Sequence, residues 1–172
     1  MSSLRDELAG GDRRSIGKSN SVVRAVLHDP ARFAEIMEGL SDQNPLVRMR
    51  CADVAEKVSR AGSDCLQPYQ RKLLDLAGGS NEQEMRWHLA QMLPRLDLNP
   101  EERCRAEAIM LEYLNDKSRI VKTFAMQALA ELAIGDLSLR RRLMPLLGNL
   151  ARTGSPAMRA RARKLIRHLK DS

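Results

Sequence analysis

Apolar residues recur along most of the chain with the spacing of an α-helix. Between residues 45 and 60 the recurring positions are Val47, Cys51, Val54, Ala55 and Val58. The same spacing marks the long segments 81–96, 117–134 and 155–170, and a shorter amphipathic segment precedes each of the four, near 30–40, 66–77, 100–114 and 139–151. A further short helix is expected over residues 21–28. No stretch alternates apolar and polar residues as a half-buried strand does, so the pattern predicts an all-α protein.

The four long segments are copies of one repeat. They open with stretches that align without gaps from Asp42, Ser80, Asp116 and Thr153. Each stretch places an apolar residue before a base, and these pairs follow one another at 38, 36 and 37 residues: Val47-Arg48, Met85-Arg86, Val121-Lys122 and Met158-Arg159. A repeat of this length is typical of proteins built from stacked helix pairs.

Capping residues mark where several of these helices begin. Asn44-Pro45 and Ser155-Pro156 each put a capping side chain before a proline at the first helical position, where the missing N–H costs nothing. Asn81 followed by Glu84 predicts a capping box at the start of the second long helix.

The stretch Asp-x-x-Pro-x-Val-Arg at residues 42–48, with its period in the high thirties, resembles a HEAT repeat. The resemblance covers about residues 30–170; the third copy lacks the proline, and the second and fourth have Ser80 and Thr153 where the first has Asp42. It implies an α-solenoid, a right-handed superhelix of about four helix pairs within residues 19–172, in which each pair buries its apolar face against its neighbours. It also implies ion pairs between turns of neighbouring repeats, formed by Asp42 and Asp116 with the recurring bases.

By the same resemblance, the second helix of each pair lines a concave face that binds a protein partner. The helical period assigns six residues to this face: Asp53, Trp87, Gln91, Arg95, Gln127 and Glu131. An outward Trp87 either anchors a partner or packs against the adjacent helix pair. The two carboxylates stand two repeats apart, roughly 20 Å at about 10 Å per helix layer, which is too far for acid and base to act on one bond. A non-catalytic scaffold is therefore favoured over an enzyme, and a DNA glycosylase of the HEAT-like alkylpurine type is the least favoured reading.

Positive charge is concentrated at one end of the chain. The whole protein carries a net charge of +7, while residues 135–172 hold ten Lys and Arg against two Asp. Five residues of the last repeat are candidates for binding phosphate or an acidic partner: Arg159, Arg161, Lys164, Arg167 and His168. This basic face is either a polar cap that keeps the last repeat soluble or a sequence-nonspecific nucleic-acid site.

Other motifs give less. Residues 10–21, GGDRRSIGKSNS, end like a P-loop, but Asp12 stands where the first glycine is required and no apolar strand precedes it. Residues 1–18 are instead expected to form a disordered arm. The three cysteines, one of them Cys104 on a charged helix, lack the spacing of zinc ligands, so no metal or cofactor is expected. Their odd number favours reduced thiols in a cytoplasmic protein. No apolar stretch reaches the length of a membrane span, so no membrane partner is expected.

Overall fold

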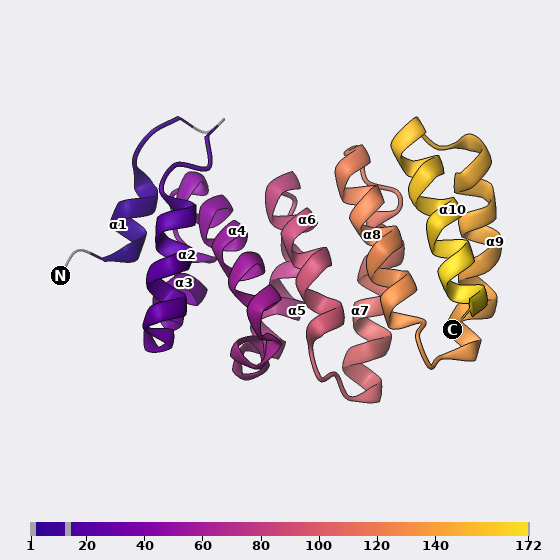
Figure 1. The fold of residues 1–172 in the computed structure, drawn as a ribbon, viewed down its shortest axis with the longest axis horizontal. Coiled ribbons are helices and arrows are strands. Elements are labelled where there is room, and N and C mark those ends of the chain that lie inside the picture. The colour runs from indigo at the N-terminus through magenta and orange to yellow at the C-terminus, as the bar shows by residue number, and fades with distance from the viewer. Residues whose placement is uncertain (1–2, 13–14, 172) are drawn as a thin grey trace. The chain divides into compact units, whose positions relative to one another are not determined.

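A computed structural model describes residues 3–12 and 15–171 of the chain. These residues form ten α-helices and three short 3-10 helices with no strand among them, which confirms the all-α prediction (Figure 1). The chain divides into two compact units, Met1–Arg71 and Lys72–Ser172. Within the described ranges, no helix has both the length and the apolar character needed to cross a membrane.

The first unit is built around one long helix. Its helices are α1 (Leu4–Ala9), α2 (Ser19–His28), α3 (Phe33–Gly39) and α4 (Pro45–Ala61). Helix α4 packs against the other three, and it begins as the sequence predicts, because the Leu46 backbone N–H donates to the Asn44 side chain over 3.0 Å and Pro45 follows the cap. Three recurring apolar residues of α4 are fully buried: Cys51, Val54 and Ala55.

The N-terminal segment differs from the disordered arm expected over residues 1–18. Residues 1, 2, 13 and 14 lie outside the described ranges, but Leu4–Ala9 form α1, and the side chains of Leu4 and Leu8 are buried. The guanidinium of Arg50, on α4, holds the segment that follows. It donates hydrogen bonds to four backbone carbonyl groups, those of Leu8, Gly10, Asp12 and Ser15. Composition gave no sign of this order, because the partner lies about 40 residues further along the chain.

Arg50 also explains a glycine of the apparent P-loop. Gly17 has φ +52°, a conformation that residues with a Cβ rarely adopt. A Cβ at this position would lie 2.7 Å from Cζ of Arg50. The glycine is therefore required by close packing against a buried cation, and the segment that precedes the loop is helix α1.

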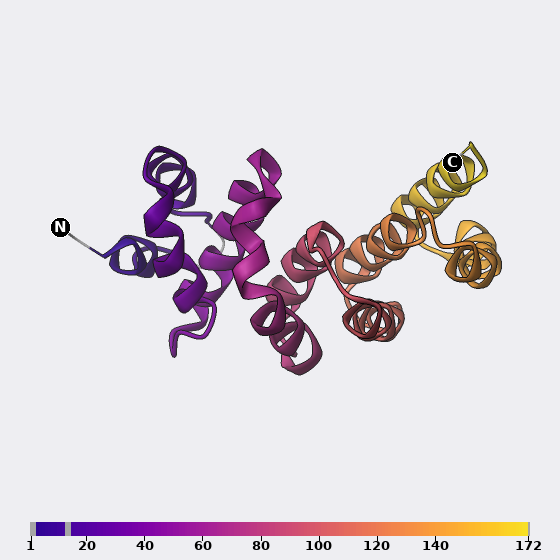
Figure 2. The same cartoon turned by 90° about the horizontal axis from the view of Figure 1, so that it is seen from below.

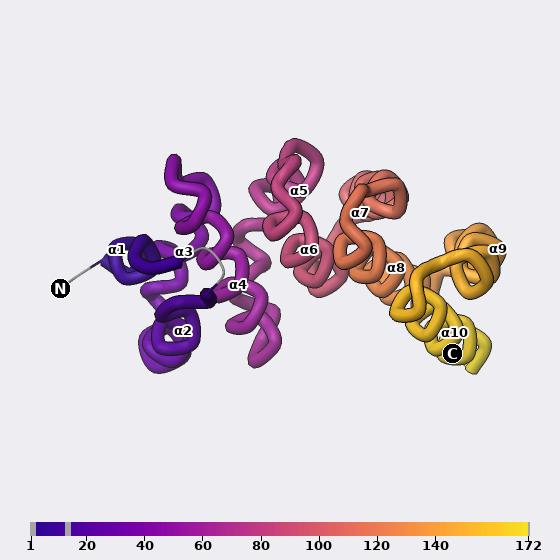
Figure 3. The backbone as a smooth tube through the Cα atoms, turned by 90° about the horizontal axis from the view of Figure 1, so that it is seen from above, coloured from indigo at the N-terminus to yellow at the C-terminus, as the bar shows by residue number. Residues whose placement is uncertain are grey.

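The second unit consists of helices in two layers. Helix α5 (Gln70–Gly79) begins at the boundary and is followed by α6 (Gln83–Met92), α7 (Pro100–Tyr113), α8 (Arg119–Leu132), α9 (Leu137–Thr153) and α10 (Pro156–Asp171). Helix α8 packs against α6 and α10, α7 packs against α8, and α9 packs against α10. Seen from below and from above, this unit has α6, α8 and α10 on one side and α5, α7 and α9 on the other (Figures 2 and 3).

One predicted helix start is wrong. The capping box expected at Asn81 does not form, because α6 begins one residue later, with Glu82 at the N-cap and no side-chain cap. The Asn81 side-chain oxygen instead accepts a hydrogen bond from Arg86 over 3.1 Å. A complete capping box forms at the start of α7, where Asn99 and Glu102 exchange hydrogen bonds. The Arg86 guanidinium on α6 therefore binds the Asn81 side-chain oxygen, which the capping-box pattern had assigned to a backbone N–H of the helix.

Candidate functional site

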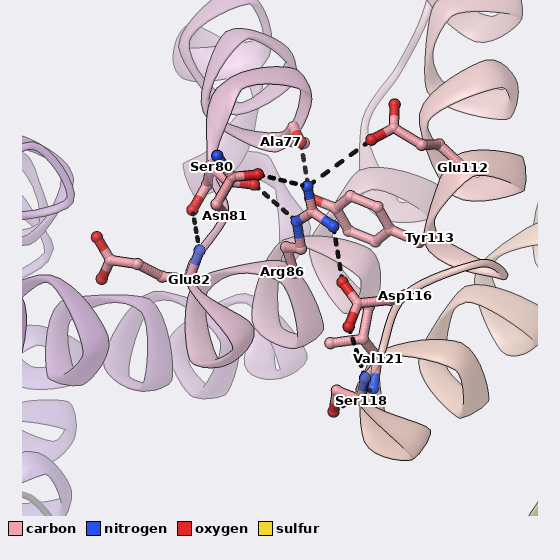
Figure 4. Close-up of polar contacts among 10 residues, drawn as sticks. All are labelled: Ala77, Ser80, Asn81, Glu82, Arg86, Glu112, Tyr113, Asp116, Ser118 and Val121. Carbon is pink, nitrogen blue, oxygen red and sulfur yellow. Dashed lines mark hydrogen bonds and ion pairs between the residues drawn. The ribbon is translucent and has the colours of Figure 1, made fainter.

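Arg86 organises the turns between helices in the second unit (Figure 4). It donates to the Ser80 carbonyl oxygen of its own turn over 2.7 Å and to the Asp116 carboxylate of the next turn over 2.7 Å. Its guanidinium carbon lies 4.9 Å from the ring centroid of Tyr113, whose hydroxyl donates to the Ala77 carbonyl oxygen. One base thus connects the starts of α6 and α8 and the end of α7.

Asp116 completes this link. Burial by itself raises the pKa of its carboxyl, but hydrogen bonds from the Ser118 backbone N–H and from Arg86 outweigh that effect, so the pKa lies below its ordinary value. The Arg86 and Asp116 side chains are only 13% and 12% exposed. The ion pair expected between turns of neighbouring repeats is therefore present at this position.

Helices α6, α8 and α10 form one side of the second unit, which we call the α6–α8–α10 face. It carries several of the residues that the helical period assigned to the partner-binding face. Trp87 of α6 is half-buried and packs edge-on against Phe124 of α8, with ring centroids 6.0 Å apart. It also contacts the ring of His88, which is buried. Packing against the adjacent helix pair was one of the two interpretations of Trp87, and the contact with Phe124 supports it.

A polar network continues the face toward α10. The Gln127 side-chain nitrogen donates to the Glu131 carboxylate over 2.8 Å, and its oxygen accepts from Arg161 over 2.8 Å. Gln91 donates to the backbone oxygen of Trp87. The structure therefore brings together Gln127 and Glu131, expected at a protein-binding face, with Arg161, expected at the basic end.

The remaining candidates are dispersed. Asp53 belongs to the first unit and pairs with Lys57 of the same helix over 2.7 Å, which satisfies its charge locally. Arg95 is half-buried in the short 3-10 helix Leu93–Arg95. On α10, Arg159 is half-buried, whereas three candidates are exposed: Lys164, Arg167 and His168.

Phe124 is a residue that the sequence reasoning missed. It adjoins Thr123, which the helical period places outward, and it is one of only two phenylalanines in the chain. With Ile120, Pro156 and Ala157 it lines a shallow, mainly apolar depression of about 450 Å³ between the first turns of α8 and α10. Its aromatic type at a position next to the outward stripe was the available signal.

A second depression adjoins the first and has a different lining. It has a volume of about 480 Å³ and shares Arg119, Ser155 and Pro156 with its neighbour. Lys122 and Thr153 also face it, and none of the described residues in its wall is a carboxylate. We call it the basic cavity.

The comparisons give no family. No family model matches the chain, and the search of curated proteins returned no match. In the parts of the chain that the structure describes, no group of three or more His, Cys, Asp or Glu side chains is placed to hold a metal ion.

Proposed function

We propose that this chain is a non-catalytic scaffold of the HEAT-like kind that binds a protein partner through the α6–α8–α10 face. The repeat of 36 to 38 residues, the two helix layers of the second unit and the Arg86–Asp116 pair between turns support a solenoid of stacked helix pairs. Stacked repeats offer continuous surfaces for binding, and a protein of this type would act in the cytoplasm without a cofactor.

The apolar depression at Phe124 carries this proposal. Ile120 at its edge is 41% exposed, and the half-buried Trp87 packs on Phe124 beside it. Arg119, Thr123 and polar groups of the α10 turn surround this apolar lining. Aromatic anchors with a polar rim are the arrangement in which protein interfaces concentrate their binding energy.

Photo-crosslinking and matched variants test the proposal. A photoreactive phenylalanine analogue at position 123 should crosslink to a protein in nuclease-treated lysate, because Thr123 lines the depression. Ile120→Asp should abolish the crosslinked product by placing a charge in the apolar contact. Leu137→Asp is the control, since Leu137 is 62% exposed at the start of α9 and lies outside the depression. A crosslink that survives Ile120→Asp, or one lost equally in Leu137→Asp, contradicts the proposal.

A specific observation also supports nucleic-acid binding as a second candidate. Four bases of α10 are exposed and form no ion pair with any described residue: Arg163, Lys164, Arg167 and Lys170. For about four neutralised phosphates, the logarithm of the binding constant for duplex DNA should fall against the logarithm of salt concentration with a slope near −3.6. Lys164→Glu with Arg167→Glu should remove binding measured by fluorescence anisotropy. Equal binding by that double variant and the wild type eliminates this candidate.

A further inference from the structure

Two successive turns of the second unit occupy equivalent places in the repeat and can be compared residue by residue. In the first, Arg86 of α6 meets the turn before α8, and Asp116 of that turn supplies the carboxylate over 2.7 Å. In the second, Lys122 of α8 takes the place of Arg86, and Thr153 before α10 takes the place of Asp116. The second turn therefore keeps the base and lacks the acid.

The basic cavity lies at this second turn. Its lining residues Arg119, Lys122 and Thr153 are the counterparts of Gln83, Arg86 and Asp116, which line a depression at the first turn. Arg119 stands where the first turn has Gln83. The second turn therefore has an additional cation at this position and no counterpart of the Asp116 carboxylate. Neither cation forms an ion pair with a described residue, although the charge of Lys122 contributes slightly to the lowered pKa of Asp116. The cavity thus has two cationic side chains and no carboxylate among the lining residues that the structure describes.

Gly154 keeps the cavity open on the α10 side. It corresponds to Lys117 of the first turn. A Cβ at Gly154 would lie 2.7 Å from the backbone oxygen of Leu150 and 2.9 Å from the Cβ of Met158. Close packing therefore excludes a side chain here, and Lys117 of the first turn has no side-chain counterpart at the second.

We propose that the basic cavity binds a carboxylate side chain of an acidic protein segment, which takes the place that Asp116 holds at the preceding turn. The chain itself supplies the precedent, because at the equivalent turn a carboxylate bridges the base on the helix and the Ser118 backbone N–H. Ser155 is the counterpart of Ser118 and lines the cavity. The proposal rests on the proposed scaffold function and specifies its partner: an acidic residue enters the cavity while an apolar neighbour contacts Phe124 in the adjoining depression.

The test supplies the missing carboxylate from within the chain. Thr153→Asp should pair with Lys122 as Asp116 pairs with Arg86, and should weaken binding of a fluorescein-labelled hexaglutamate peptide at low salt about fivefold, the size of one partly exposed ion pair. Thr153→Asn introduces a side chain of the same shape as Asp but without its charge, so this variant should bind the peptide like the wild type. Ser138→Asp adds the same charge at the other end of α9 and should also bind like the wild type.

A second measurement locates the peptide. In two-dimensional NMR spectra, titration with hexaglutamate should shift the backbone amide signal of Ser155 in the wild type, and Thr153→Asp should need about five times more peptide to reach half of its own shift. Equal peptide affinity in the wild type and Thr153→Asp overturns the proposal, and so does an equal loss in Ser138→Asp. Inorganic phosphate binding more tightly than the peptide would overturn the assignment to a protein segment. The peptide titration measures binding to the cavity without the cellular partner. It can therefore succeed or fail independently of the crosslinking experiment.

Discussion

Replacement of Asp116 by Ala tests how much the link between turns stabilises the second unit. The carboxylate accepts two hydrogen bonds, one from Arg86 and one from the Ser118 backbone N–H, each over 2.7 Å. Both members of the ion pair are nearly nine-tenths buried, so water replaces these bonds poorly. Arg86 keeps its hydrogen bond to Ser80 and its contact with Tyr113, which limits the loss. We expect the free energy of unfolding to fall by about 2 kcal/mol.

Urea unfolding followed by the fluorescence of Trp87 measures this loss. Trp87 is the only tryptophan of the chain and stands next to Arg86 on α6, so its signal reports on the second unit. A double-mutant cycle with Arg86→Met, which keeps the apolar stem over Tyr113, should give a coupling energy of about 1 kcal/mol between the two charged groups.

A matched ion pair provides the control. Arg105 and Asp75 also approach to 2.7 Å, but their side chains are 46% and 56% exposed. Asp75→Ala should therefore cost about 0.5 kcal/mol or less, because water screens an exposed pair. Equal losses for Asp75→Ala and Asp116→Ala, or a coupling energy of zero between Arg86 and Asp116, would refute the argument that burial decides the strength of this link.

Three further predictions follow from the contacts. Because the pKa of Asp116 is lowered from its ordinary 3.8, the extra stability of the wild type over Asp116→Asn should be complete at pH 6 and disappear as the pH falls below 3.8, which urea unfolding at several pH values would show. Arg50→Met should cost about 3 kcal/mol in urea unfolding and speed hydrogen exchange in residues 4–9, whereas unchanged exchange would mean that Arg50 does not hold this segment. Gly39→Ala should lower stability by about 2 kcal/mol, since its Cβ would overlap Sγ of Cys51, while Gly62→Ala, which meets no atom within 4 Å, should change thermal stability little; equal effects would contradict the packing argument.

The positions of the helices could be predicted from the sequence, because they depend on interactions between residues a few positions apart. The apolar spacing placed α4, α8 and α10 close to their observed bounds, and Asn44-Pro45 marked the start of α4. The exposure pattern followed from the same period, so Lys164 and His168 are exposed as expected. The repeat in the alignment also placed Asp116 where a base of the preceding repeat could reach it.

Contacts between distant segments were decided only by the tertiary structure. Local composition classed the N-terminal segment as an arm, yet Arg50 binds carbonyl groups about 40 residues earlier in the chain. Local capping rules assigned Asn81 to the backbone, yet Arg86 competes for its oxygen. A charged donor brought close by packing outweighs a weak local preference.

The candidate site shows the same division. The sequence by itself determined which residue types stand at each turn, including the change from Asp116 to Thr153, and which helix faces point outward. Only the packing of α8 against α6 and α10 joined Trp87 to Phe124, and Gln127 to Arg161. Only that packing left a cavity beside Lys122, because a helix period defines directions around one axis, whereas the distance between two axes depends on every side chain packed between them.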